Sequence, residues 1–244
     1  MDYLVIIPAR YKSSRLKGKP LIDLNGVPMI IRTYRQCLKV VPANMIYVAT
    51  DSDLIKKVCT EEGAQVIMTS PNCLTGTDRV AEVSKKIQAN TYINVQGDEP
   101  VFNPEDLKLL LNEIKKYPKE IITGYCEIDN DSTYRDLNVP KVVIRPDGRL
   151  LYASRSPIPS NKLNKFEKGW RQVCVYAFPK MALEVFSARK VKTELEKIED
   201  IEYLRFLELG IDVRTLKMSK MSLAVDTPDD VAKVKEIIKK LDLK

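Results

Sequence analysis

Apolar and polar positions follow one another in regular blocks along the first half of the chain. Short apolar runs without period-two alternation predict buried strands at residues 3–8, 45–49, 65–68, 91–96 and 121–127. Amphipathic stretches between them predict helices at residues 28–40, 53–62, 77–87 and 104–117. Continuous apolar strands that alternate with helices are typical of a parallel sheet covered on both faces, so we expect an α/β fold of the Rossmann-like kind.

The second half of the chain has a looser order. Apolar segments predict strands at residues 141–144, 150–152, 173–178 and 211–217, and helical patterns occupy residues 180–188, 198–209 and 229–241. Pro-rich turns lie between residues 154 and 160. A length of 244 residues suits one domain. We therefore expect a single domain over residues 1–244, with a β-rich, antiparallel insertion at approximately 130–217.

Composition excludes several classes of protein. With 44% apolar and 30% charged residues, the chain is ordinary globular protein. It has no apolar run long enough for a membrane helix, and its start has no basic leader of the signal-peptide kind. The five cysteines have no paired spacing, which favours reduced thiols. We expect a cytoplasmic protein that does not associate with a membrane.

Histidine is absent from the sequence. This excludes a Ser-His-Asp triad, a Cys-His dyad, histidine-ligated zinc and acid–base catalysis by histidine. The formal net charge is +7, which suits nucleic acid or anionic small substrates. The cations are dispersed among acids and no nucleic-acid-binding motif is present, so we expect no nucleic-acid partner. A basic nucleic-acid-binding protein is the non-enzymatic alternative.

The loop after the first predicted strand is rich in cations. Its positive side chains are Arg10, Lys12, Arg15, Lys17 and Lys19. Small residues between them let backbone N–H groups approach a ligand, so the loop favours a bound polyphosphate. The pattern is neither a Walker A loop nor a dinucleotide-binding G-x-G-x-x-G motif. The alternative is a solvated basic loop.

Two carboxylates are candidates for holding a magnesium ion. Asp98 directly follows the strand predicted at residues 91–96, and Asp226 precedes the last predicted helix. Ligands of open α/β sheets bind at the carboxyl ends of the strands, where Asp98 would lie. Two carboxylates that hold Mg²⁺ against substrate phosphates are a common arrangement. The alternative for Asp226 is a turn or a helix cap, although Asp229 and Asp230 suit the helix start better.

Six motifs occur in an order that resembles a known family. They are IIPARYKSSRLKGKPL, VATD, TGTDRVAE, NVQGDEP, SRSPIP and LAVDTPDD. Together they resemble the 3-deoxy-D-manno-octulosonate (KDO) cytidylyltransferases, or CMP-KDO synthetases, over essentially the whole chain. The resemblance implies a Mg²⁺-dependent nucleotidyltransferase of lipopolysaccharide biosynthesis, in which the anomeric hydroxyl of an acid sugar attacks the α-phosphate of CTP. It also implies a homodimer formed through the smaller β-rich part.

The resemblance assigns roles to individual residues. The residues implied in catalysis are Arg10, Lys19 and Asp98. Those implied in nucleotide binding are Arg10, Arg15, Lys19, Gly76, Thr77, Arg79 and Gln96. Those implied on the sugar side are Gln96, Arg155, Gln172, Tyr176, Glu202 and Tyr203, and the metal-binding acids are Asp98 and Asp226. A guanidinium at Arg155 could pair bidentately with the sugar carboxylate.

The chain departs from the family pattern mainly in the sugar half. Gln172 stands where the family usually has His, Cys174 where it has Gly, and Tyr203 where it has Gln. Ser160 replaces a common aromatic residue, and Cys73 replaces a common His. Two interpretations are open. The changes are neutral and the sugar is KDO, which is the leading interpretation, or the enzyme uses another acid sugar, such as 8-amino-3,8-dideoxy-octulosonate.

Overall fold

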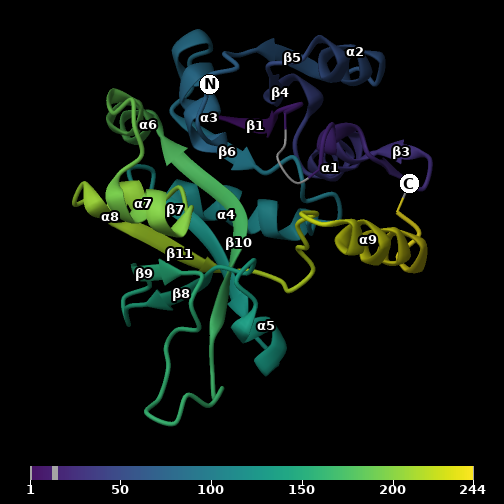
Figure 1. The fold of residues 1–244 in the computed structure, drawn as a ribbon. Coiled ribbons are helices and arrows are strands. Elements are labelled where there is room, and N and C mark those ends of the chain that lie inside the picture. Colours follow the sequence, from purple (N-terminus) through teal and green to yellow (C-terminus); the bar gives the residue numbers. More distant parts are fainter. Residues whose placement is uncertain (1, 13–15, 244) are drawn as a thin grey trace.

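A mixed β-sheet runs through the middle of the molecule, with helices on both faces (Figure 1). The structure is a computed structural model that describes residues 2–12 and 16–243. Within these residues the sheet has nine strands, seven of them in the order β11-β7-β10-β6-β1-β4-β5. A separate antiparallel pair is formed by β2 (Asp23–Leu24) and β3 (Val27–Pro28).

The N-terminal half of the sheet is parallel, as the sequence pattern predicts. It consists of β5 (Gln65–Met68), β4 (Ile46–Thr50), β1 (Tyr3–Ala9) and β6 (Thr91–Val95). On β1, Leu4 and Ile6 pack on one face of the sheet, and Val5 and Ile7 pack on the other. Both faces of β1 are therefore buried, which explains why its sequence shows no polar alternation.

One strand runs against the others in the row of seven. The strand β10 (Trp170–Pro179) lies antiparallel between β6 and β7 (Ile121–Glu127), and β11 (Val213–Lys217) lies parallel to β7 at the edge. The hairpin of β8 (Lys141–Ile144) and β9 (Leu150–Ser154) joins β10 at the pair Arg171 and Lys141. The antiparallel part thus extends into the centre of the sheet, and mostly parallel order is confirmed.

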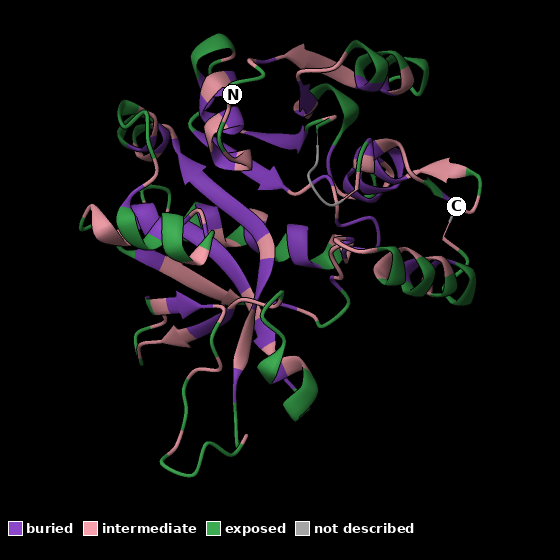
Figure 2. Ribbon diagram, viewed as in Figure 1, coloured by how far each residue is buried: buried purple, intermediate pink, exposed green. Residues whose placement is uncertain are grey.

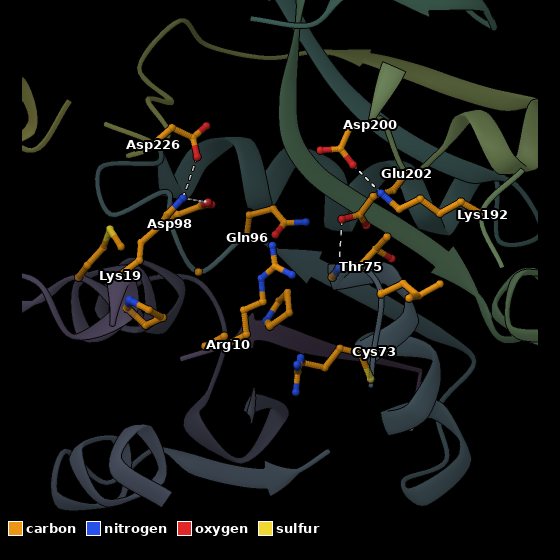
Figure 3. Close-up of a pocket in the computed structure, with 18 residues that line it drawn as sticks. Arg10, Lys19, Cys73, Thr75, Gln96, Asp98, Lys192, Asp200, Glu202 and Asp226 are labelled. Atoms are coloured by element: carbon orange, nitrogen blue, oxygen red, sulfur yellow. Dashed lines mark hydrogen bonds and ion pairs between the residues drawn. The ribbon is translucent and has the colours of Figure 1, made fainter. Parts of the chain in front are cut away.

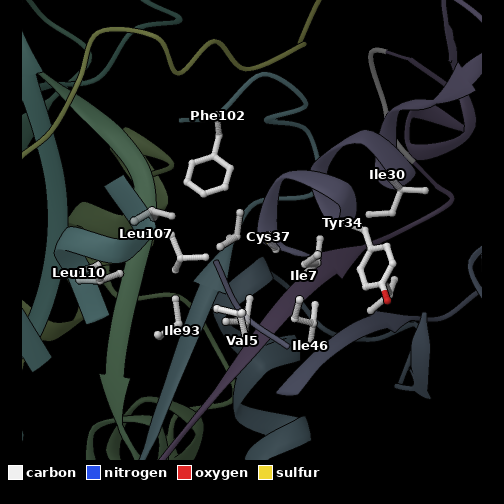
Figure 4. Packing of buried hydrophobic residues seen from close by; sticks show 14 of the residues in the cluster. Val5, Ile7, Ile30, Tyr34, Cys37, Ile46, Ile93, Phe102, Leu107 and Leu110 are labelled. Carbon is white, nitrogen blue, oxygen red and sulfur yellow. The ribbon is translucent and has the colours of Figure 1, made fainter. Parts of the chain in front are cut away.

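Helices cover the two faces of the sheet. One face carries α1 (Met29–Leu38), α2 (Asp53–Glu61) and α4 (Pro104–Lys116), and the other carries α3 (Gly76–Lys86), α6 (Lys180–Ala188) and α8 (Leu204–Glu208). Figure 4 shows the first cluster, in which Tyr34, Phe102 and Leu107 pack on one face of β1 and β6. These side chains are fully or almost fully buried, so apolar burial fixes the sheet on which the strand ends are displayed.

The C-terminal helix returns the chain to its N-terminal half. The helix α9 (Pro228–Lys240) buries Val234 and Ile238 against Leu24 and Val101. This third cluster lies beside the short 3-10 helix η1 (Lys19–Leu21), and Figure 1 shows the C-terminus close to β3. The segment before α9 is thereby brought to the carboxyl end of β6.

The helix predicted at residues 198–209 is wrong as a single element. The chain forms α7 (Glu194–Glu199) and α8, separated by Asp200 in a left-handed conformation with φ of 52°. Buried Arg205 on α8 donates to both carboxylate oxygens of Glu196 on α7, at 2.6 and 2.7 Å. This ion pair joins the two short helices. The break places Glu202 in the loop between them.

Some elements escaped the sequence prediction. They are η1, β2, β3, the 3-10 helix η2 (Ala43–Met45) and α5 (Asp131–Arg135). Residues 155–169 form a long and largely exposed loop between β9 and β10 (Figure 2). None of the helices in the described part of the chain has the length and apolar character needed to cross a membrane. No observation tests the boundaries of the proposed insertion, which stay a prediction.

Candidate active site

A cleft opens at the carboxyl ends of the parallel strands. Its lining comes from the loops after β1 and β6, the start of α3, and the segments before α7, α8 and α9. Figure 3 shows Lys19, Asp98 and Asp226 at one end, with Lys192 and Glu202 at the other. Ligands of open α/β sheets bind at this edge, so the cleft is the candidate active site.

The polar cluster at the first end is built by three separate segments. Nζ of Lys19 donates to Oδ2 of Asp98 at 2.6 Å and to Oδ1 of Asp226 at 2.9 Å. The backbone N–H of Val225 donates to the carbonyl of Asp98 at 3.0 Å, which ties the two acid-bearing segments together. The sequence prediction that Asp98 and Asp226 face one site therefore agrees with their placement.

Lys19 is held in this position by its surroundings. Burial alone would lower its pKa, but the charges of Asp98 and Asp226 and the hydrogen bonds to them raise the pKa above its ordinary value. The ammonium therefore stays charged at neutral pH. Gly18, with φ of 66°, makes the turn that starts η1 and aims Lys19 into the cleft.

The place of the Lys19 ammonium between the two acids indicates where a metal ion would fit. The carboxylates of Asp98 and Asp226 converge on one positive group, and their oxygens are the donors that Mg²⁺ prefers. In the described part of the chain, no group of three or more His, Cys, Asp or Glu side chains could hold a metal ion. Asp98 and Asp226 fit a site that takes its other ligands from substrate and water.

Two glycines let the backbone close around the cleft. A Cβ on Gly97 would lie 2.7 Å from the carbonyl oxygen of Pro8, so any other residue would push β1 and the loop after β6 apart. A Cβ on Gly76 would lie 3.0 Å from Nε2 of Gln96. The predicted residues Gly76 and Gln96 therefore contact each other, whereas the importance of Gly97 was missed.

Arg10 lies in the middle of the cleft. It is exposed, and Figure 3 shows it pointing toward Gln96. Its expected contact with a polyphosphate stays a prediction. Arg15, which was predicted beside it, lies outside the described residues.

Glu202 caps the start of α3. One carboxylate oxygen accepts the N–H of Gly76 at 3.0 Å, and the other accepts the N–H of Thr77 at 2.8 Å and its hydroxyl at 2.5 Å. Burial raises the pKa of Glu202, and these hydrogen bonds offset part of the rise. The residue expected at the sugar thus lies directly on the helix start expected at the nucleotide.

Arg79 lines the cleft, but its guanidinium is engaged by other side chains. Its guanidinium is 3% exposed and donates to Asp51 at 3.2 Å and to the hydroxyl of Thr69. Asp51 in turn accepts the N–H of Tyr11 at 3.4 Å. Arg79 therefore braces the loop after β1, and its expected nucleotide contact stays a prediction.

Arg155 does not line the cleft. Its guanidinium donates to the carbonyls of Glu199, Leu137 and Asp200 at 2.6, 3.0 and 3.1 Å. These contacts join the end of β9 to the break between α7 and α8 and to the loop after α5. Lys192 lines the cleft instead and lies 2.5 Å from Asp200. Only its place in a cation-rich segment could have indicated it.

Three residues expected at the sugar are buried and absent from the lining. Gln172 donates to the hydroxyl of Tyr176, whose ring lies 6.1 Å from that of Tyr203. Within the described residues, the hydroxyl of Tyr203, Oε1 of Gln172 and both amide atoms of Asn94 have no hydrogen-bond partner. Asn94 pairs with Tyr176 across the strands, so these atoms form a polar layer on one face of the sheet.

Glu99 is a buried acid next to the candidate metal ligand. Burial, followed by the charge of Asp98, raises its pKa from 4.5 to about 7. The hydroxyl of Ser222 donates to its carboxylate. Sequence reasoning missed Glu99 because nothing local distinguishes it from a solvated acid after a strand.

Comparisons with known proteins agree over the whole chain. The sequence profile of a family described as cytidylyltransferase matches residues 4–216. The 3-deoxy-manno-octulosonate cytidylyltransferase of Chlorobium phaeobacteroides is 38% identical over 243 residues, with 98% of each chain covered. The Escherichia coli protein of the same name is 35% identical, with 96% of this chain and 95% of its own covered.

A solved structure has the same fold. CMP:2-keto-3-deoxy-manno-octonic acid synthetase complexed with CTP superimposes with a TM-score of 0.91 at 34% identity. The match covers 99% of this chain and 100% of the other. The shared fold includes the segments that carry Lys19, Asp98 and Asp226.

Proposed function

The chain belongs to the cytidylyltransferase family, among the 3-deoxy-manno-octulosonate cytidylyltransferases, and from this premise we propose that it couples CTP to the acid sugar KDO. The products are CMP-KDO and pyrophosphate. The observation that carries the proposal is the cluster of Lys19, Asp98 and Asp226 beside Arg10, at the carboxyl ends of the strands. Relatives that are 35–38% identical over nearly their full length bear the name of this activity.

The reaction needs no protein nucleophile. The anomeric hydroxyl of the sugar gives its proton to water and its oxygen forms a bond to the α-phosphorus of CTP. The bond from that phosphorus to the bridging oxygen breaks, and pyrophosphate leaves. Arg10 and Lys19 neutralise the negative charge that grows on the leaving group. With no histidine in the chain, catalysis rests on positioning and charge.

The family implies a divalent metal, and we propose Mg²⁺, held by Asp98 and Asp226. Bound there, Mg²⁺ would neutralise phosphate charge and polarise the phosphorus for attack. The two acids supply hard oxygen donors, and substrate and water supply the rest. A metal between the acids would displace the ammonium of Lys19 from Asp98 and Asp226, and the phosphates of CTP would then accept its hydrogen bonds.

The sugar end of the cleft is the end with Glu202, Gln96 and Lys192. Among the described residues, Lys192 lines this end and would meet the sugar carboxylate by leaving Asp200, whereas Arg155 does not line the cleft. The buried polar layer that includes Gln172 and Tyr203 has groups without a hydrogen-bond partner. A rearrangement that exposes this layer to the cleft would let these groups bind sugar hydroxyls. These residues support an acid sugar as substrate.

The experiment that tests the activity is product formation from CTP and a panel of acid sugars. The purified chain is incubated with CTP, Mg²⁺ and KDO, its 8-amino-3,8-dideoxy analogue or a nonulosonic acid, and products are identified by mass. We expect the CMP-sugar and pyrophosphate in equal amounts, with KDO preferred. Preference for the amino sugar would correct the substrate, and no CMP-sugar from any acid sugar would refute the proposal.

We propose that two copies of the chain form a homodimer through the β8–β9 hairpin. Exposed apolar side chains gather on and beside it, including Leu151 on β9 at 54% exposure and Ile198 on α7 at 68%. Light scattering coupled to size-exclusion chromatography tests this. A dimer that Leu151→Glu converts to a monomer supports the surface, and an unaffected dimer contradicts it.

Because CTP is a cytoplasmic metabolite, we expect the reaction in the cytoplasm.

A further inference from the structure

A strap of residues 218–226 carries Asp226 to the cleft. It runs without regular secondary structure from the end of β11 to the start of α9 (Figure 1). Its first residue, Met218, donates its N–H to the carbonyl of Tyr125 at 2.8 Å. Near its end, Val225 donates to the carbonyl of Asp98. An irregular segment of this kind needs further contacts to hold one side chain in one place.

Asp106 fixes the beginning of the strap. It lies in the first turn of α4 and is 1% exposed. One of its carboxylate oxygens accepts the N–H of Ser219 at 2.9 Å, and the other accepts the hydroxyl of Ser219 at 2.6 Å. Both oxygens of a buried acid are thus used on one residue of the strap.

Arg171 fixes the middle of the strap. It lies on β10, and its Nη2 donates to the carbonyls of Lys220 and Ser222, each at 3.1 Å. A single guanidinium group therefore holds two carbonyls that regular secondary structure would otherwise satisfy. Neither Arg171 nor Asp106 lines the cleft.

We propose that Asp106 and Arg171 are positioning residues that hold Asp226 opposite Asp98. The inference rests on the proposed function, because it takes Asp226 as a metal ligand of the cytidylyl transfer. The two anchors act through the backbone of the strap and touch neither substrate. Groups that orient metal ligands affect metal affinity or activity by about 10- to 100-fold when they are removed.

The test uses Asp106→Ala and Arg171→Ala in the full-length enzyme, with Mn²⁺ as the metal. We expect the half-saturating Mn²⁺ concentration to rise, or kcat to fall, by about 10- to 100-fold, with KM for CTP changed less than about 3-fold. Asp106→Asn keeps an oxygen for the N–H of Ser219 and an amide for its hydroxyl, so it should rescue most of the loss. Folded alanine variants in which both the half-saturating Mn²⁺ concentration and kcat are unchanged overturn the proposal.

Arg32→Ala is the matched control. Arg32 also donates to backbone carbonyls, of Leu24 at 2.7 Å and Leu243 at 2.9 Å. Unlike the strap, the two residues that it fixes do not carry a cleft residue. It should lower the melting temperature without changing the Mn²⁺ dependence. An equal change in Mn²⁺ dependence with Arg32→Ala would mean that general loosening explains the result, and would overturn the proposal.

A double-mutant cycle with Asp226→Asn separates the two claims. If the anchors act through Asp226, Arg171→Ala should cost less than about 2-fold in the Asp226→Asn background. Equal costs in both backgrounds overturn the positioning role. Full activity of Asp226→Asn itself refutes the metal assignment, whatever the anchors do. Hydrogen exchange supplies a readout without substrate: the amides of residues 219–226 should exchange faster in both alanine variants than in Asp106→Asn.

Discussion

Replacing Lys19 with methionine should tighten metal binding to the nucleotide-free protein while slowing the reaction. In the structure the ammonium donates to Asp98 at 2.6 Å and to Asp226 at 2.9 Å, in the position where the two acids would hold a metal. A cation can enter only if these contacts break. Methionine has a similar length and no charge, so it removes this competition without emptying the space.

The size of the effect follows from the two contacts of Lys19. A hydrogen bond to a charged group is worth about 1.5–3 kcal/mol. The two bonds together are worth about 3–6 kcal/mol. We take half of this sum, about 1.5–3 kcal/mol, because the released ammonium regains contacts with water. Since each 1.4 kcal/mol is tenfold in affinity, Mn²⁺ should bind the variant about 10- to 150-fold more tightly.

Electron paramagnetic resonance of free Mn²⁺, in titrations without nucleotide, measures this affinity directly. Lys17 of the same loop provides the control, because Lys17→Met removes the same formal charge from an exposed position. Turnover of Lys19→Met should fall more than the affinity for CTP, since the ammonium stabilises charge that grows as pyrophosphate leaves. Equal Mn²⁺ affinity in the wild type, Lys19→Met and Lys17→Met would refute the reasoning.

Four further predictions concern the acids and the sugar end. Asp98→Asn should stay folded by circular dichroism but lose most turnover with Mg²⁺, because an amide is a poor Mg²⁺ ligand, and near-full turnover would contradict the assignment. Lys192→Gln should raise KM for the sugar about 10-fold and leave KM for CTP nearly unchanged, and steady-state kinetics in which only CTP is affected would exclude its sugar role. The pKa of Glu99 is about 7 in the folded protein, against an ordinary value of 4.5. In urea unfolding, the free energy of unfolding of the wild type should therefore fall by about 3 kcal/mol relative to Glu99→Gln as pH rises from 4.5 to 7. Parallel pH profiles of the two proteins would argue against a raised pKa. The double variant Gln172→His with Tyr203→Gln should shift the ratio of kcat/KM between KDO and its 8-amino analogue by about 5- to 150-fold toward KDO, and an unchanged ratio would mean neutral drift.

Local patterns predicted most elements of the fold. Runs such as that of β1 are apolar because both of their faces are buried, and a buried strand needs no knowledge of its neighbours to be identified. The place of β10 between β6 and β7 could not be read in this way, because strand pairing depends on contacts distant in sequence. The break at Asp200 was hidden because the segment on each side has helical composition.

The placement of the candidate residues could be predicted best where backbone geometry decides it. Asp98 follows a strand end and Asp226 precedes a helix start, and both places converge on the edge of the sheet. Predictions for Arg155 and Tyr203 depended on where long side chains point. The carbonyls around the helix break take the guanidinium of Arg155, and the ring of Tyr203 packs on that of Tyr176. Sequence spacing contains no information on such competition.

The reversed strand β10 also sets the order in which the sheet can be completed during synthesis. The strands β1, β4, β5 and β6 all precede residue 96, so this half can form early, but β6 then has an open edge. The strand β7 is synthesised next and cannot cover that edge, since its partners in the sheet are β10 and β11. An unpaired edge invites pairing with another chain. We therefore expect a nascent chain that stalls between residues 128 and 169 to expose β6 and β7 together and to be prone to aggregate.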